Sequence, residues 1–158
     1  MKRLFILAAA VITGFGAIAQ QKADEVIKFN EEKYDFGKIK QNQPVTTYFT
    51  LTNTSDKVVV IENAWAGCGC TTPEYSKEPI PSGGSTQLKV GYNAATIGRF
   101  DKEVYVKLAG VQEPKKVLIT GEVVEGSAYD AWTKTDEYKK LEKAKLAKQG
   151  KDKGSKKS

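Results

Sequence analysis

Short runs of alternating apolar and polar residues, separated by turn signals about every ten residues, constrain the fold of positions 26–125 more than any other feature. The clearest run is Pro44–Asn53, in which every second side chain from Val45 to Leu51 lies on one face of a strand. Further strands are predicted at 26–29, 57–63, 85–93, 99–108 and 117–124. With no convincing helix between them, these runs predict an all-β fold, an immunoglobulin-like antiparallel β-sandwich of about seven strands.

Three segments receive more specific interpretations. Tyr34–Gly37 is interpreted as a turn that leads into Lys38–Ile39, because glycine favours turns. The β-branched run Val58–Ile61 is predicted to be a buried strand. Asn53-Thr54-Ser55 matches the N-glycosylation acceptor pattern but is interpreted as part of a turn. About 100 residues can bury one modest core, so one domain is expected.

The N-terminus has the three parts of a secretory signal peptide. Lys2 and Arg3 are followed by the apolar run Leu4–Ala19, which ends in a small-residue cleavage pattern. We expect cleavage between Ala19 and Gln20, and an exported protein of the periplasm or the cell surface, or a secreted one. An uncleaved anchor is the alternative, although the run is short for a span of about 20 residues. No later segment is apolar enough to span a membrane, so no integral membrane span is expected in the mature chain.

The net charge of +6 is unevenly distributed along the chain. The signal peptide carries +2, residues 20–125 carry −1, from thirteen basic and fourteen acidic residues, and residues 126–158 carry +5, from ten lysines and five acids. The predicted domains are therefore a signal peptide at 1–19, a nearly neutral sandwich at 20–125 and a Lys-rich tail at 126–158. A neutral body in an exported chain argues against nucleic acid as a partner.

The tail is predicted to be partly helical. Thr135 is placed to cap a helix whose first turn carries Asp136 and Glu137, and Gly150 is placed to end it. Because its apolar stripe is thin, the tail is interpreted first as a solvated helix with a disordered end. The alternative is electrostatic contact with an anionic surface, such as phospholipid head groups, glycan or an acidic protein.

The chain contains no histidine, which excludes Ser-His-Asp and Cys-His catalysis and any metal site with imidazole ligands. Glu31-Glu32 and the pair Asp101 and Glu103 are the notable carboxylate pairs, and they are expected in a loop and on the solvent face of a strand. No glycine-rich loop lies between a strand and a helix, so nucleotide binding has no support. The sequence therefore favours a protein that is not an enzyme and has no cofactor.

Cys68 and Cys70 are the only cysteines, and they are separated by one glycine. In an extended strand their Cα atoms would be about 6.6 Å apart, whereas disulfides prefer about 5.5–6 Å. They could bond only if the backbone kinks, which Gly67 and Gly69 would permit. A loop this small contributes about 1.5 kcal/mol in the chain-entropy estimate, so the bond would be a weak and easily reduced staple.

Four interpretations of the pair remain open. It is a structural disulfide in an oxidising compartment, or two buried unpaired thiols beside Trp65, or a redox-active or partner-linking dithiol, or a soft-metal site. For the metal site, two thiolates suit Cu(I) better than zinc, because zinc needs further ligands that histidine cannot supply here. Copper is thus the one cofactor that the sequence suggests, as an alternative.

The order and spacing of several motifs resemble those of a known family. The match begins at Tyr34-Asp35-Phe36-Gly37, continues through Gly67-Cys68-Gly69-Cys70-Thr71 and ends at Ile119 and Gly121. Over residues 30–123 the chain resembles domain-of-unknown-function family 1573, exported bacterial proteins with an immunoglobulin-like sandwich. The resemblance implies a Gram-negative source and a domain that binds or scaffolds other proteins, and it supplies no catalytic residues.

The sequence thus favours an exported, non-enzymatic β-sandwich that binds or scaffolds a protein or a component of the cell envelope. The first alternative is a thiol–disulfide or Cu(I)-handling protein that uses Cys68 and Cys70, with Trp65 and Thr71 shaping the site. The second alternative is a carbohydrate-binding module, for which Trp65 and Tyr75 are the candidate stacking platforms.

Overall fold

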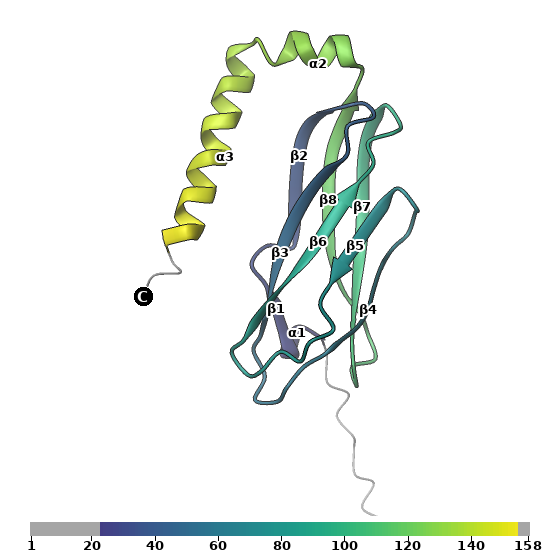
Figure 1. The fold of residues 1–158 in the computed structure, drawn as a ribbon, viewed down its shortest axis with the longest axis vertical. Coiled ribbons are helices and arrows are strands. Elements are labelled where there is room, and N and C mark those ends of the chain that lie inside the picture. The colour runs from purple at the N-terminus through teal and green to yellow at the C-terminus, as the bar shows by residue number, and fades with distance from the viewer. Residues whose placement is uncertain (1–22, 155–158) are drawn as a thin grey trace, which may run out of the picture.

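The computed structural model describes residues 23–154, so the predicted cleavage site at Ala19 and Gln20 lies outside the described residues. Within them, eight strands form two four-stranded sheets, in the orders β1-β3-β6-β5 and β2-β8-β7-β4 (Figure 1). The predicted sandwich is confirmed. The elements are α1 (Ala23–Val26), β1 (Ile27–Phe29), β2 (Lys33–Lys40), β3 (Val45–Asn53), β4 (Ile61–Ala66), β5 (Thr71–Tyr75), β6 (Ser85–Tyr92), β7 (Gly98–Leu108), β8 (Lys115–Val124), α2 (Gly126–Trp132) and α3 (Asp136–Gly154).

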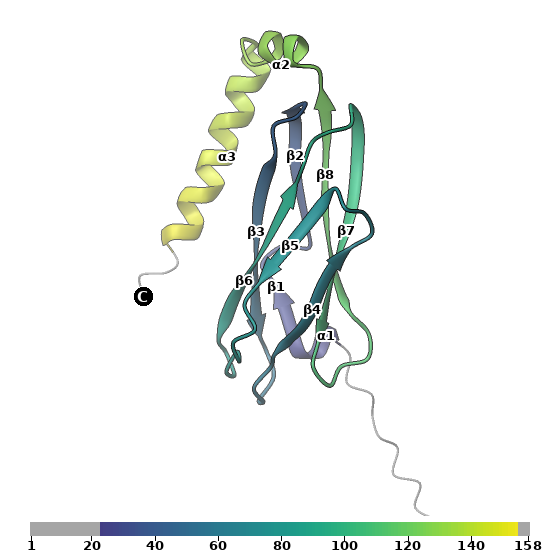
Figure 2. The same cartoon turned by 45° about the vertical axis from the view of Figure 1, so that its right-hand side comes forward.

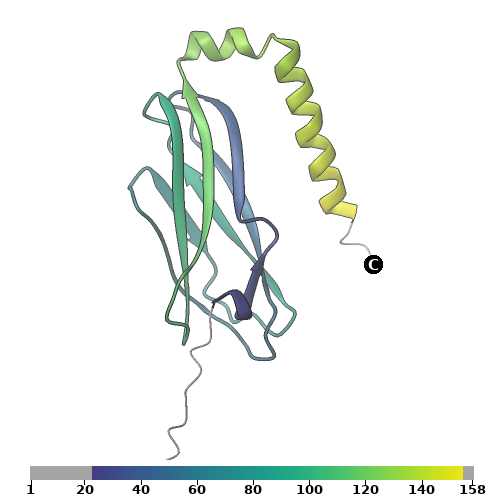
Figure 3. The same cartoon turned by 180° about the vertical axis from the view of Figure 1, so that it is seen from behind.

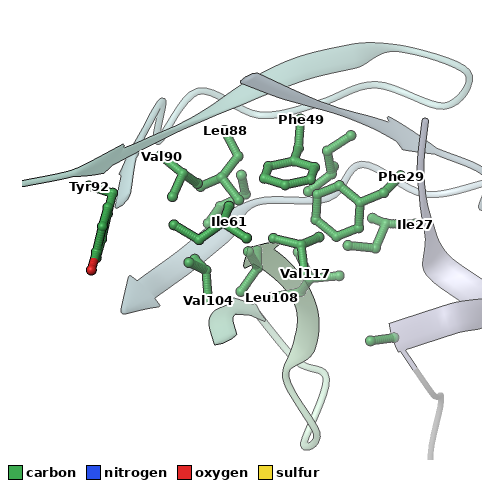
Figure 4. Packing of buried hydrophobic residues seen from close by; sticks show 14 of the residues in the cluster. Ile27, Phe29, Phe49, Ile61, Leu88, Val90, Tyr92, Val104, Leu108 and Val117 are labelled. Atoms are coloured by element: carbon green, nitrogen blue, oxygen red, sulfur yellow. The ribbon is translucent and has the colours of Figure 1, made fainter. Parts of the chain in front are cut away.

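The core lies between the inner faces of the two sheets. On β3 the side chains of Thr47, Phe49 and Leu51 are buried while those between them are more exposed, as the alternation predicts. β3 pairs with β6 in an unbroken antiparallel register that aligns Phe49 with Leu88. Figure 4 shows these side chains meeting those of the opposite sheet. The largest fully buried residues are Phe49, Ile27, Leu51, Ile61, Leu88, Leu108, Ile119, Val90, Val104, Val106, Val117 and Val123.

The segment predicted to be a turn at Tyr34–Gly37 is instead part of strand β2. β2 runs parallel to β8, so this pair departs from the antiparallel pattern, and its register shifts between Asp35 and Lys38. Gly37 at this bulge has φ 70°, and its N–H donates to the Asp35 carboxylate at 2.9 Å. The Asp-Phe-Gly sequence is therefore turn-like only locally: it forms a bulge that the strand continues through.

The region after β3 also differs from the prediction. Val58 is 63% exposed, Val59 makes a single bridge to Ile80, and strand β4 begins only at Ile61. The predicted strand is therefore wrong for Val58, Val59 and Val60, although Val59 is buried as predicted, and β4 continues instead to Ala66. β5 was not predicted, because it is short and contains Pro73. It brings the number of strands to eight.

Asn53 explains why the chain leaves β3 where it does. Its side chain is fully buried, and its Nδ2 donates to the carbonyls of Lys57 at 2.7 Å and Ile80 at 2.9 Å. Its Oδ1 accepts from the backbone N–H and the hydroxyl of Ser55, at 2.9 and 2.8 Å. One buried amide thus provides hydrogen-bond partners for backbone groups of the turn after β3 and of the bridge segment beside it.

After β8 the chain forms two helices. α2 leads away from the end of β8, and α3 turns back to run alongside the sandwich (Figures 1 and 3). The N–H of Tyr138 donates to the Thr135 hydroxyl at 3.4 Å, so Thr135 caps α3 as expected. The predicted stop at Gly150 is wrong, since α3 continues to Gly154. None of the helices in the described residues is long and apolar enough to span a membrane.

Replacing Asn53 with alanine should lower the free energy of unfolding by about 2 kcal/mol or more, because two carbonyls near the core lose their donor. Urea denaturation of Asn53→Ala beside Asn63→Ala measures this. Asn63 is exposed on β4, so its substitution should change the free energy by less than about 0.5 kcal/mol. Equal losses in the two variants would show that the buried amide does not organise this turn.

Candidate functional site

The turn between β4 and β5 connects the edge strand of one sheet to the edge strand of the other. β4 and β5 lie side by side at this corner, which Figure 2 brings forward. Residues 67–70 form the turn, and Cys68 and Cys70 are joined within it by a disulfide with a Cα–Cα distance of 5.3 Å. The N–H of Thr71 donates to the Cys68 carbonyl at 3.3 Å, and that of Asn93 to the Cys70 carbonyl at 3.0 Å. The turn therefore shortens the distance between the two Cα atoms below that of an extended strand.

The glycines around the pair do not have the role that the sequence suggested. Neither Gly67 nor Gly69 has a positive φ, and a Cβ added to either would meet no atom within 4 Å. Gly121, in contrast, lies under the Phe100 ring, where an added Cβ would come within 2.7 Å of a ring carbon and 2.9 Å of the Gly37 carbonyl oxygen. The kink at the disulfide therefore does not require glycine, whereas the β2–β8–β7 packing does.

The two sulfur atoms have different surroundings. Cys70 packs against the hydrophobic core, while Cys68 lines a cleft of about 380 Å³ together with Gly67, Asp101, Lys102, Glu103 and Tyr105. The buried hydroxyl of Thr71 lies 3.9 Å from Cys68 Sγ and 3.8 Å from Cys70 Sγ. Thr71 thus contacts both sulfurs, and Cys68 is the one that faces the cleft.

The disulfide bears on the other interpretations of the pair. The two sulfur atoms are bonded to each other, so the interpretation of the pair as two buried unpaired thiols is wrong. A Cu(I) site would need two thiolates, and these exist only after the bond is reduced. Among residues 23–154, no group of three or more Cys, Asp or Glu side chains is arranged to hold a metal ion.

An aromatic pair, of which Trp65 is exposed and Tyr105 is half-buried, lies next to the disulfide on the outer face of the β7–β4 edge. Trp65 on β4 is aligned with Tyr105 on β7, and their rings stack with centroids 5.5 Å apart and planes 14° apart. The Trp65 side chain is 38% exposed. Trp65 was a candidate from the sequence, but Tyr105 was not. The signal that places Tyr105 outward is the alternation with the buried residues Val104 and Val106.

Tyr105 belongs to a small charged network. Its hydroxyl donates to the Glu103 carboxylate, which also accepts from Lys116 Nζ at 2.7 Å. The hydrogen bond from Lys116, with that from Tyr105, holds the pKa of Glu103 below its usual value. In return, the hydrogen bond to Glu103 raises the pKa of the Tyr105 phenol. The network fixes the orientation of Tyr105 and therefore of the stacked pair.

Tyr75, the other candidate stacking platform, is used differently. Its ring packs against the core, and its hydroxyl donates to the Glu62 carbonyl at 3.3 Å. Tyr75 lies on β5, and its hydrogen bond connects β5 to β4. The structure therefore does not bring it together with Trp65 as a second stacking platform for a sugar.

A second cleft lies where the tail meets the sandwich. Trp132 and Leu141 from the helices and Lys38 and Arg99 from the strands contribute to its lining. Lys38 Nζ lies 5.5 Å from the centre of the Trp132 ring, and Lys40 forms a 2.9 Å ion pair with Asp130. These contacts attach α2 to β2, so the cleft lies at the contact between the C-terminal helices and the sandwich.

Comparisons with known proteins agree with this architecture. The family described as "Protein of unknown function (DUF1573)" matches residues 27–123. No match is found among curated proteins. A protein of unknown function from Porphyromonas gingivalis has 14% identity and a TM-score of 0.54, with 69% of this chain and 51% of that chain covered. This chain thus spans about half the length of that protein.

Two further solved structures share the fold. The PapD-like domain 7 of human CEP192 has 8% identity and a TM-score of 0.51, with 65% of this chain and 87% of that chain covered. The VesB protease of Vibrio cholerae has 14% identity and a TM-score of 0.54, with 64% and 33% covered. At these identities the likeness concerns the sandwich fold alone.

The contrast between the glycines is testable. Gly69→Ala should change the free energy of unfolding by less than about 0.5 kcal/mol and leave the disulfide formed. Gly121→Ala should cost about 1–3 kcal/mol, because its Cβ must displace Phe100. Urea denaturation and a thiol assay on both variants measure this. If Gly69→Ala were the more damaging change, the backbone at the disulfide would require glycine after all.

Proposed function

This chain belongs to the DUF1573 family of proteins of unknown function, and we propose that it is an exported, non-enzymatic β-sandwich that binds another protein. Binding uses the outer face of β4 and β7 around Trp65 and Tyr105. The export part of the proposal rests on the basic and apolar segments of the first 19 residues, and the non-enzymatic part on the lack of histidine. The fold is compatible with a binding module.

The observation that carries the proposal is the stack of the exposed Trp65 ring on the half-buried Tyr105 ring. Tryptophan and tyrosine are enriched in the centres of protein interfaces, where they provide most of the binding energy. Here the pair is held in advance by the strand register and by the network of Tyr105 with Glu103 and Lys116. A pre-ordered aromatic surface costs little side-chain entropy on binding.

The charges around the pair indicate the chemistry of the partner. Asp101 and Glu103 on β7 and Lys116 on β8 share the outer face with Tyr105, so both signs of charge occur within one small surface. A phospholipid surface or an anionic glycan would be repelled by the carboxylates. A protein that presents an apolar patch surrounded by charges of both signs fits this surface better.

The structure gives less support to two other modes of binding. Stacking of a sugar needs free ring faces, but Trp65 shares one face with Tyr105, and Tyr75 packs inward. Addition of a partner strand to β5 is hindered by Pro73, which lies on that edge and has no N–H to donate. The proposed surface is therefore the strand face at this corner and not the β5 edge.

Site-specific photo-crosslinking in the intact source cells tests the proposal. A photoreactive amino acid at position 65 should yield a discrete protein adduct, and the same residue at position 48 should not. Tyr48 is a matched control, because it is an aromatic residue 52% exposed on β3 in the other sheet. Adding Tyr105→Ala should reduce the adduct at position 65 about tenfold or more, in line with an aromatic hot spot.

The adduct is then identified and its binding measured with purified components, comparing the unmodified chain with Trp65→Ala and Tyr48→Ala. The proposal requires a loss of affinity in Trp65→Ala only. Equal adduct yields at positions 65 and 48, or equal affinities of the two alanine variants, would contradict it.

A further inference from the structure

The Cys68–Cys70 disulfide adds little to the mechanical integrity of the corner where it lies. It closes a loop between residues only two positions apart. The same turn is already held by hydrogen bonds from Thr71 N–H to the Cys68 carbonyl and from Asn93 N–H to the Cys70 carbonyl. β4 and β5 are in turn held by their pairing with β7 and β6. A disulfide that restrains so little of the chain needs another explanation.

The two sulfurs are unequal in a way that suits thiol–disulfide exchange. Cys68 faces the cleft beside Tyr105, while Cys70 packs on the core. An incoming thiolate can therefore reach Cys68 Sγ from the cleft, and Cys70 becomes the leaving group. In exchange reactions the rate depends on which sulfur is accessible and on how well the departing thiolate is stabilised.

Thr71 is placed to stabilise that departing sulfur. Its hydroxyl lies 3.8 Å from Cys70 Sγ, within reach of a hydrogen bond to sulfur, and the residue is only 4% exposed. A hydroxyl next to a thiolate can donate to it, and hydrogen bonds to charged groups are stronger than those to neutral ones. The same hydroxyl lies 3.9 Å from Cys68 Sγ, so it can also serve the reverse reaction.

We propose that Cys68–Cys70 is an exchangeable disulfide that accepts two electrons from a dithiol, with Cys68 forming the mixed disulfide. The first substrate thiolate bonds to Cys68 Sγ, the Cys68–Cys70 bond breaks, and its electron pair remains on Cys70 as a thiolate. The second substrate thiolate then attacks the substrate sulfur of the mixed disulfide and releases Cys68 as a thiolate. The substrate leaves as a disulfide, the chain as a dithiol, and the two protons of the substrate thiols pass to solvent or to the cysteines. This activity is separate from the proposed binding function.

The first test uses the purified, oxidised protein in buffers of reduced and oxidised glutathione. At successive times the free thiols are blocked with N-ethylmaleimide, and the position of bound glutathione is determined by fragment-ion mass spectrometry. The bond should become reduced in millimolar glutathione, and early glutathione should be found on Cys68 at least tenfold more often than on Cys70. A bond that stays oxidised in this buffer, or equal labelling of the two sulfurs, would overturn the proposal.

A second arm replaces glutathione with a reduced peptide that carries two cysteines, at equal thiol concentration. Faster reduction by the peptide indicates a protein dithiol as the source of electrons, and faster reduction by glutathione indicates a small thiol. Either result supports exchange at this site. If neither glutathione nor the peptide reduces the Cys68–Cys70 bond, the proposal is overturned.

The role of Thr71 is tested with Thr71→Val, which has the same shape but no hydroxyl. It should slow the reduction by roughly three- to tenfold, the value of one hydrogen bond. The matched control is Thr72→Val, at the exposed neighbouring position of β5, which should leave the rate unchanged. The rate of Thr71→Val is compared only after thermal denaturation shows a cooperative fold. An unchanged rate in a folded Thr71→Val variant would remove the hydroxyl from the mechanism.

Discussion

The inner faces of β3 and β6 bury their alternate side chains against those of β7 and β8, and the position of every other feature depends on this packing. Phe49, Leu88, Val104 and Val117 are among the buried residues that meet there (Figure 4). Burying such a side chain stabilises the fold by about 1.5–3 kcal/mol each. Because the inward positions are fixed by period-two alternation, the outward positions are fixed as well. Tyr105 is outward because Val104 and Val106 are inward.

The same packing leaves one corner where two sheet edges meet. β4 and β5 are each paired on one side only, and the turn between them carries the disulfide. Of the two sulfurs, Cys70 packs on the core, while Cys68 and the stacked aromatic pair face outward. The disulfide and the Trp65–Tyr105 stack thus lie together at a corner formed by two edge strands. Strand pairing and backbone hydrogen bonds hold these groups in place, which is the arrangement that a recognition or exchange site requires.

The sequence predicted the parts of this structure that depend on local periodicity. The sandwich, the face of β3 that is buried and the Thr135 cap all follow from neighbouring residues. It did not predict features that depend on partners far along the chain. The sequence Asp35–Gly37 is typical of a turn, and only its pairing with β8 makes it part of a strand. β5 was missed because it is short and contains Pro73, a residue that is rare in strands. For the site, Cys68 and Cys70 were identified, but the stack of Trp65 on Tyr105 depends on a register across 40 residues.

The disulfide corner, proposed here as an exchange site, lies on a fold that stands without it. The amide resonances of the labelled protein, recorded before and after reduction of the disulfide, test this most directly. Shifts should concentrate in residues 65–71 and their neighbours at Asn93 and 101–105, while the dispersed resonances of core residues such as Phe49 and Leu88 remain in place. Loss of dispersion across the whole spectrum on reduction would contradict it, because the disulfide would then be what holds the sandwich together.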